Sequence, residues 1–291
     1  MTHTKEWLYA WLLITPALAL LALFTHYPAL ANLWHSFYST PKGARGVVFV
    51  GVENYRTLID DPIFWQALGN NLWYALGTIP LSIVLALLMA VWVNDRIPGR
   101  GLLRLAYFTP TILPMIAVAN IWLFFYTPEY GLLEKITNAF GLPTHNWLGS
   151  KNTALACLMA VTVWKEAGFF MIFYLAALQQ MSPQLADAAA IEGASRWYFF
   201  RRVTFPLLMP TTFFVLVNAV INAFRLVDHV VVMTRGGPDN ATELLLYYIY
   251  EIGFRFWDPA YAATLTIVLL AVLGLAALGQ FGFLERRVHY R

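Results

Sequence analysis

Charge is what this sequence has least of. Charged residues make up 12% of its 291 residues, whereas hydrophobic residues make up 59%. A soluble domain carries roughly 25% charged residues, so this chain has too few to cover a surface that faces water. The composition excludes an ordinary soluble protein and predicts a membrane protein. The length suits one bundle of about six spans of roughly 20 residues each, with connecting loops.

Several kinds of chemical site are also missing. Cys157 is the single cysteine, so an internal disulfide is excluded, and its apolar surroundings predict a buried, unreactive thiol. No two histidines stand at metal-ligand spacing, and Gly236-Gly237-Pro238 lacks the Lys-Ser/Thr of a phosphate-binding loop. The small net charge of +3 argues against a nucleic-acid partner. We therefore expect a chain that is not an enzyme, holds no metal or cofactor and hydrolyses no ATP itself.

Long apolar runs are what the sequence does have. We expect membrane spans at about 7–25, 72–93, 105–126, 153–178, 206–232 and 260–283, forming one transmembrane domain over residues 1–291. The first run is longer than the apolar region of a secretory signal, so it should remain as an uncleaved helix. The third run contains Pro110 and Pro114. Such breaks survive in lipid only where protein or water satisfies the freed carbonyls.

The basic residues predict how these spans are oriented. One set lies in the termini and the short connections, and the other lies in longer loops. The first set comprises Lys5, Arg96, Arg100, Arg104, Arg196, Arg201, Arg202, Arg286, Arg287 and Arg291; the second includes Lys42, Arg45 and Lys151. The positive-inside rule places short basic segments in the cytoplasm. Both termini and the connection between the fourth and fifth spans should therefore be cytoplasmic.

That connection, at about 182–206, contains a short amphipathic helix by its pattern. Ser182 is a suitable N-cap, and Pro183 fits the first helical position, where its missing N–H costs nothing. Gly193 can take the left-handed conformation that ends a helix. The small side chains between them would let another backbone approach closely, so the helix suits a groove on a partner. The alternative is an ordinary helix between spans with no partner.

Three stretches resemble one family. Asp187-Ala188-Ala189, Gly193-Ala194 and Phe205-Pro206 together resemble the "EAA…G…LP" loop of ABC-importer permeases, with Asp187 in place of the usual Glu. Residues 51–55 resemble a "GLxNF/Y" segment, and residues 233–258 resemble "MTGGGP…T…L…YIY…F", with Arg235 in place of the first glycine. The likeness is to permeases of binding-protein-dependent carbohydrate importers of the maltose/glycerol-3-phosphate type.

The resemblance implies an all-α type I importer permease of six transmembrane helices in the bacterial inner membrane, with a coupling helix between helices four and five. It implies that this helix docks on an ATPase subunit. The contacting residues would be Leu185, Asp187, Ala188, Ala189, Glu192, Gly193 and Ala194. Two ATPase subunits would bind ATP and Mg, beside a second homologous permease and a periplasmic or lipid-anchored substrate-binding protein. ATPase closure would drive alternating access for a sugar, polyol or derivative.

The fourth and fifth spans carry polar groups for a substrate path. Trp164-Lys165-Glu166 lies near the middle of the fourth span, where a charge costs roughly 2.5–3.5 kcal/mol and normally faces a cavity or a partner. Asn218, Asn222 and Arg225 share one helical face. A sugar needs hydrogen-bonding groups and a flat apolar surface. With the family's sugar-contacting positions as a guide, the expected path is Thr162, Trp164, Glu166, Phe169, Asn218, Asn222 and Arg225.

Two alternatives stay open for these charges. They can be structural ion pairs or contacts to a second permease, because in some of these importers one of the two permeases holds the substrate. They can also form the ion relay of a secondary carrier, through Lys165, Glu166 and Asp228; such a carrier would need no docking helix. The sequence leaves open which sugar, polyol or anionic derivative is carried, and which ATPase and binding protein take part.

Overall fold

The computed structural model describes residues 2–41, 46–95, 98–141 and 143–284, and most of them are helical. The β-structure in these ranges is one isolated bridge, between Tyr38 and Phe49. The basic residues Lys42, Arg45, Arg96, Arg286, Arg287 and Arg291 lie outside the described residues. An all-α fold, as expected from the sequence, is confirmed.

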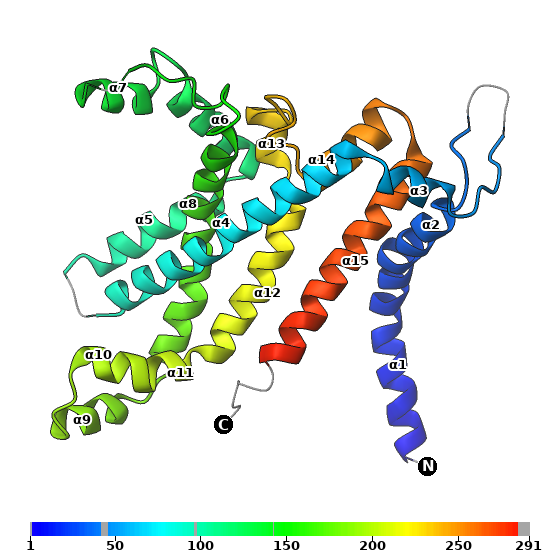
Figure 1. Ribbon diagram of the computed structural model, residues 1–291. Coiled ribbons are helices and arrows are strands. Elements are labelled where there is room, and N and C mark those ends of the chain that lie inside the picture. Colours follow the sequence, from blue (N-terminus) through cyan, green and yellow to red (C-terminus); the bar gives the residue numbers. More distant parts are fainter. Residues whose placement is uncertain (1, 42–45, 96–97, 142, 285–291) are drawn as a thin grey trace. The chain divides into compact units, whose positions relative to one another are not determined.

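Figure 1 labels the α-helices in chain order, and three π-helical elements, η1 to η3, lie between them. They are α1 Thr2–Leu21, η1 Ala22–His26, α2 Tyr27–His35, α3 Glu53–Ile59, α4 Pro62–Asn94, α5 Arg100–Ile112, α6 Met115–Tyr126, α7 Leu132–Ala139, α8 Ala154–Gln179, α9 Pro183–Ile191, α10 Arg196–Phe199, η2 Phe200–Thr204, α11 Phe205–Leu207, α12 Met209–Arg225, α13 Asp228–Met233, α14 Leu245–Tyr250, η3 Glu251–Arg255 and α15 Pro259–Leu284. The three η elements are π-helical turns that continue their neighbouring helices.

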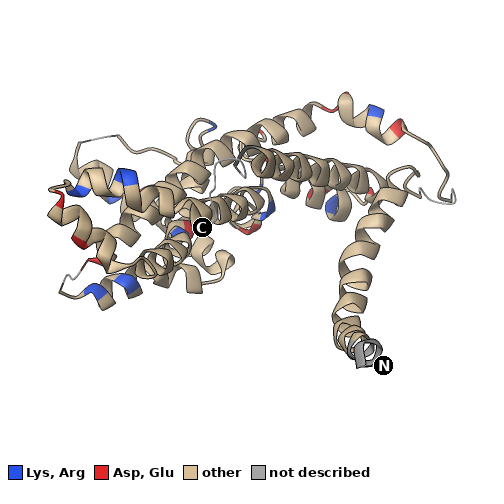
Figure 2. Cartoon of the chain, turned by 90° about the horizontal axis from the view of Figure 1, so that it is seen from below, with Lys and Arg blue, Asp and Glu red and all other residues tan. Residues whose placement is uncertain are grey.

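In the described part of the chain, five helical stretches are long and apolar enough to cross a membrane: Tyr9–His35, Pro62–Asn94, Ala154–Gln179, Met209–Met233 and Pro259–Gly282. They match five of the six expected spans, although the first and second are longer than predicted. Figure 2 shows that these long helices are drawn almost wholly without charged residues. The spans therefore follow from the apolar runs of the sequence.

The remaining expected span, 105–126, which is the third along the chain, differs from the prediction of one helix. It consists of α5 and α6, which are bent by 102° at the break between Ile112 and Met115. Leu113 is extended (φ −74°, ψ 137°) because the ring of the following proline disfavours the helical conformation. Pro114 also brings no N–H to the helix. The sequence indicated a break, and the structure shows that the break turns the chain sharply.

The chain forms two compact units: the smaller comprises the described residues within 1–62 and 248–272, and the larger comprises those within 63–247 and 273–291. In the smaller unit, one oxygen of Asp61 accepts hydrogen bonds from the hydroxyls of Tyr248 and Tyr261, both at 2.6 Å. Ser36 and Tyr55 join their hydroxyls at 2.8 Å. These bonds tie α2, α3, α14 and α15 of this unit together around the residues that precede α4.

The centre of the larger unit is α8. In the apolar stretch of α8, 56% of the residues are buried. The corresponding share is 28% in α4 and 33% in Met209–Met233, which contains α12. Ala86 and Ala90 of α4 share a buried cluster with Phe170 and Tyr174 of α8 and Val215 of α12. Small residues let helix backbones approach closely, which is how helices associate in lipid, where the hydrophobic effect between them is weak.

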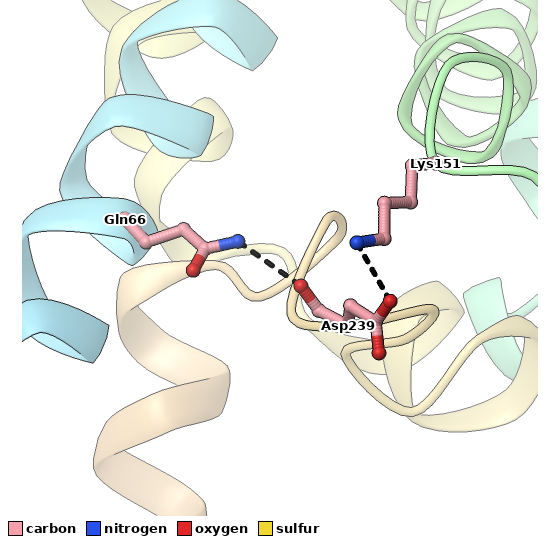
Figure 3. A network of polar contacts seen from close by, with 3 residues as sticks. All are labelled: Gln66, Lys151 and Asp239. Atoms are coloured by element: carbon pink, nitrogen blue, oxygen red, sulfur yellow. Dashed lines mark hydrogen bonds and ion pairs between the residues drawn. The ribbon is translucent and has the colours of Figure 1, made fainter.

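The connection between α13 and α14 is anchored to the larger unit at two sides (Figure 3). The carbonyl of Asp239 accepts a hydrogen bond from Gln66 of α4 at 3.1 Å, and its carboxylate pairs with Lys151 at 2.7 Å. Asn70, one turn further along α4, donates to the carbonyl of Asn240 at 2.8 Å. The ion pair is exposed and contributes little by itself. The amide hydrogen bonds from Gln66 and Asn70 therefore hold this connection to α4 more than the ion pair does.

Candidate functional site

Helices α5, α6, α8 and α12 of the larger unit line a partly open cavity of about 510 Å³. It holds six of the seven residues predicted for a substrate path: Thr162, Glu166, Phe169, Asn218, Asn222 and Arg225. Thr111, Met115, Lys165, Ile221 and Leu226 complete the lining. Residues of α12 reach the cavity because Asn218, Asn222 and Arg225 recur at helical spacing on one face. The structure thus gathers most of the expected residues around one space.

Trp164 is the exception. It lines a separate apolar pocket of about 550 Å³, together with Trp122, Phe125 and Tyr126 of α6. Its ring stands at 5.6 Å from that of Trp122, edge to face. Residues two apart on a helix point to different sides, so Trp164 cannot share the face of Glu166. The structure therefore places Trp164 outside the cavity in which it was expected.

Lys165 lies at the break between α5 and α6. Its ammonium donates to the carbonyl oxygens of Pro110 at 3.0 Å, Thr111 at 3.3 Å and Leu113 at 2.5 Å. A lysine ammonium has three N–H donors, and these carbonyls engage all three. The charge that looked anomalous in the middle of a span therefore satisfies the backbone groups that the proline break releases.

Glu166 gives the cavity a buried acceptor. The residue is 7% exposed, and Asn222 of α12 is close enough for a side-chain hydrogen bond with it. Its Oε1 has no hydrogen-bond partner among the residues that the structure describes. Most buried polar atoms are hydrogen-bonded, so a buried carboxylate oxygen without a partner, on a residue that lines a cavity, is suited to a hydroxyl group of a ligand. In the described ranges, no group of three or more His, Cys, Asp or Glu is arranged for a metal ion.

A layer of polar residues behind the cavity was not predicted. The hydroxyl of Tyr74 of α4 bonds Thr162 Oγ1 at 2.5 Å and His229 Nε2 of α13 at 2.9 Å. One turn earlier, Asn71 donates to the carbonyl of Ala223 at 3.0 Å. Asn71 could have been noticed as an amide next to an apolar run. Tyr74 carries no such signal, because a tyrosine in an apolar run also suits a lipid-facing position.

Helix α9 has the form that the sequence predicts. Gly193 adopts a positive φ of 71° just beyond its end, and Ala194 N–H returns to the carbonyl of Ala189 at 2.9 Å. Ser182 has the extended conformation of an N-cap, but its hydroxyl donates to the Gln184 side chain instead of capping the backbone. None of the residues of α9 is buried, and Ile191 is 88% exposed. The seven residues expected to contact a partner, 185, 187–189 and 192–194, thus lie in and just after an exposed helix.

The two halves of the site are covalently linked. Helix α8 leads through a short turn into α9, and α10, η2 and α11 lead from α9 into α12. Both α8 and α12 line the cavity. Helix α9 is therefore connected along the chain to two helices that line the cavity.

Comparison with known proteins identifies the family. The sequence model of the family described as "Binding-protein-dependent transport system inner membrane component" matches residues 79–290. The chain belongs to this family. The resemblance drawn from its residues is confirmed, and the chain is a membrane permease component of such a system, not itself a catalytic subunit.

Several curated permeases are similar over nearly the whole chain. The lactose transport system permease protein LacF of Rhizobium radiobacter is 33% identical, covering 93% of this chain and 92% of that one. The sn-glycerol-3-phosphate permease UgpA of Yersinia pestis bv. Antiqua is 32% identical, covering 98% and 97%. The sulfoquinovosyl glycerol permease SmoG of Agrobacterium fabrum is 32% identical, covering 91% and 86%.

One solved structure supports the fold. A chain of the bacterial alginate ABC transporter, solved in complex with an alginate pentasaccharide-bound periplasmic protein, superposes with a TM-score of 0.85. The identity is 22%, and the match covers 97% of this chain and 96% of that chain. The all-α permease fold is therefore shared with an ABC transporter.

Proposed function

We propose that this chain is the permease subunit of an ATP-driven importer that moves a sugar or sugar derivative across the bacterial inner membrane by alternating access. The observation that carries the proposal is the link between cavity and exposed helix. The two helices that leave and rejoin α9, namely α8 and α12, are also the two that supply the polar cavity wall. A partner that moves α9 would thereby change which side the cavity opens to.

The cavity suits a substrate rich in hydroxyl groups. Its volume of about 510 Å³ lies within the range of small-molecule sites. Glu166 and Asn222 offer acceptors and donors, and the exposed ring of Phe169 offers a flat apolar surface for a sugar face. Relatives named for lactose, sn-glycerol-3-phosphate and sulfoquinovosyl glycerol support the same class. Arg225 at the cavity also fits an anionic derivative, so the proposal covers neutral and acidic sugars.

The coupling partner we propose for α9 is an ATPase subunit. Two such subunits bind ATP and Mg, and their closure moves α9. A second, homologous permease and a substrate-binding protein complete the importer, with both termini and α9 of this chain in the cytoplasm. The exposed, small-residue surface of α9 supports this role, since close approach of another backbone needs small side chains.

An ion-coupled carrier is the rival function, and one observation weighs against it. It would use Lys165 as part of a relay, yet the three donors of Lys165 are engaged by backbone carbonyls. With its three donors engaged by the backbone, Lys165 has no donor left for an ion relay.

Reconstitution tests the proposal. The permease, co-expressed with its second permease and ATPase, is placed in proteoliposomes with the binding protein and a sugar that this protein retains. We expect uptake that requires ATP and survives collapse of the ion gradients by ionophores. Uptake that continues without ATP and stops with the gradients would instead establish the carrier.

A further inference from the structure

We propose that Lys165 is a positioning residue for transport, which fixes the shape of the cavity wall by holding the break between α5 and α6. The transport part of this inference rests on the function proposed above. The structural part, that the Lys165 side chain holds the backbone at this break, does not depend on that function.

The break leaves backbone groups that need partners. Pro114 has no N–H, and Leu113 and Pro114 are both extended, so the last carbonyls of α5 lose their helical donors. An unsatisfied carbonyl in a membrane is strongly unfavourable. Lys165 of α8 supplies hydrogen bonds to three of them, and its positive charge meets the negative end of the α5 dipole. One side chain thus replaces the donors that the proline break removes.

The residues on either side of the break belong to the cavity. Thr111 precedes it, Met115 follows it, and both line the cavity. Beyond Met115, α6 turns away by 102°. The position of these two residues in the wall therefore depends on the angle at the break, and that angle is held from α8 by Lys165.

A second contact brings the backbones of α5 and α8 close together near Lys165. Gly168 lies one turn from Lys165, on the same side of α8. A Cβ added at Gly168 would stand 2.0 Å from the carbonyl oxygen of Tyr107 in α5. The two backbones are therefore as close as glycine permits, and little slack remains between the ammonium and the carbonyls. Glu166, between these two anchors, lines the cavity and has one buried oxygen without a hydrogen-bond partner among the described residues.

Replacement of Lys165 tests its role in transport. Lys165→Met keeps an unbranched side chain but removes the three donors, so we expect the KM of uptake to rise about tenfold, with the complex still assembled. Lys165→Arg keeps a cation that can donate to carbonyls, although its guanidinium is larger than an ammonium, so its KM should rise less than that of Lys165→Met. Lys135→Met, on the exposed face of α7, is the control and should change nothing. An unchanged KM in Lys165→Met would overturn the inference.

Chemical rescue separates the ammonium from general packing. In a Cys157→Ala background, Lys165→Cys leaves one thiol, because Cys157 is the only cysteine. Alkylation with 2-bromoethylamine then rebuilds a side chain of lysine length that ends in an ammonium. We expect a low KM to return after this treatment, and not after methyl methanethiosulfonate, which adds neither charge nor donor. Failure of rescue despite complete alkylation would refute the role of the ammonium.

A distance measurement needs no transport. Spin labels at Leu105 of α5 and Phe124 of α6, both exposed, report the angle at the break. We expect one narrow distance distribution with Lys165 and a broader one with Lys165→Met. Equal distributions would overturn the inference. The two proposals can fail separately. If the wild-type complex takes up no sugar, but Lys165→Met still broadens the distance distribution, the result counts against the proposed function alone.

Discussion

Glu166 and Asn222 stand opposite each other in the cavity, one on α8 and the other on α12. The carboxylate can only accept hydrogen bonds, whereas the amide can donate and accept. Together they can orient a sugar hydroxyl that donates to one and accepts from the other. Because the two residues come from the two helices joined through α9, the spacing between them is the quantity that a moving α9 would change.

Asn222→Ala removes the amide from this pair. We expect the KM of uptake to rise by about threefold to tenfold, the loss typical of one hydrogen bond to a ligand. The amount of permease and its association with the ATPase should not change, because Asn222 lies in the cavity and α9 does not. Sugar-dependent uptake into proteoliposomes, with quantification of the co-purified ATPase, measures both. Unchanged uptake kinetics would remove Asn222 from the site.

Tyr74→Phe tests the layer behind the cavity. The change removes a hydroxyl that bonds both Thr162 and His229, and leaves two buried polar groups without that partner. We expect a loss of about 1–3 kcal/mol in stability, seen as a lower melting temperature of the purified protein. Tyr130→Phe, on an exposed residue, is the matched control. Equal melting temperatures for the two variants would show that the Tyr74 hydroxyl contributes nothing.

Some of these residues could be predicted and others could not, for physical reasons. Helical periodicity alone predicts a polar face made of Asn218, Asn222 and Arg225, because it aligns them on one side of the helix. Trp164 was expected in the path as a flat apolar surface for a sugar, but it lines a different pocket from Glu166, because residues two apart on a helix point to different sides. Tyr74 becomes significant only when α4, α8 and α13 bring their side chains together, which no local pattern encodes.

At the scale of elements, the break between α5 and α6 shows a similar limit. Two prolines predict an interruption because they remove donors and disfavour helical geometry before them. They do not predict an angle of 102°, because the direction of the chain is set by what satisfies the freed carbonyls. That partner is Lys165, on another span. Helix α9 was easier to predict, because its start, its small residues and its terminal glycine are all local signals.

Gly193→Asp tests α9 as a coupling element. Gly193 has a positive φ of 71° and no atom within 4 Å of an added Cβ, so the chain itself has room for the new side chain. Asp also tolerates a positive φ better than most residues. We expect ATP-driven uptake to fall by about tenfold or more, because a charge would enter a close-packed partner surface. The chain should remain in the membrane.

Gly141→Asp is the control for that experiment. Gly141 also has a positive φ, 72°, with open space around an added Cβ, but it lies beyond α7 rather than next to α9. The two variants therefore share their backbone cost and differ in location. Uptake that is normal in Gly193→Asp, or equally reduced in both variants, would remove the coupling role.

At the scale of the whole molecule, the proposal depends on orientation. A docking helix must lie on the cytoplasmic side, where an ATPase can reach it, and the distribution of basic residues in the sequence predicts this side. The orientation is best tested with two exposed positions that the prediction places on opposite sides of the membrane.

Ile191 in α9 and Phe140 after α7 serve this purpose, since they are 88% and 79% exposed. Each is changed to cysteine in the Cys157→Ala background and treated with a membrane-impermeant maleimide. On spheroplasts, we expect labelling at position 140 and not at 191, and the reverse on inverted membrane vesicles. Added ATPase should then lower labelling at 191 in the vesicles and leave 140 unlabelled. Labelling of 191 from the outer side would place α9 where no ATPase can bind it, and ATP-driven movement of the cavity walls would lose its mechanical basis.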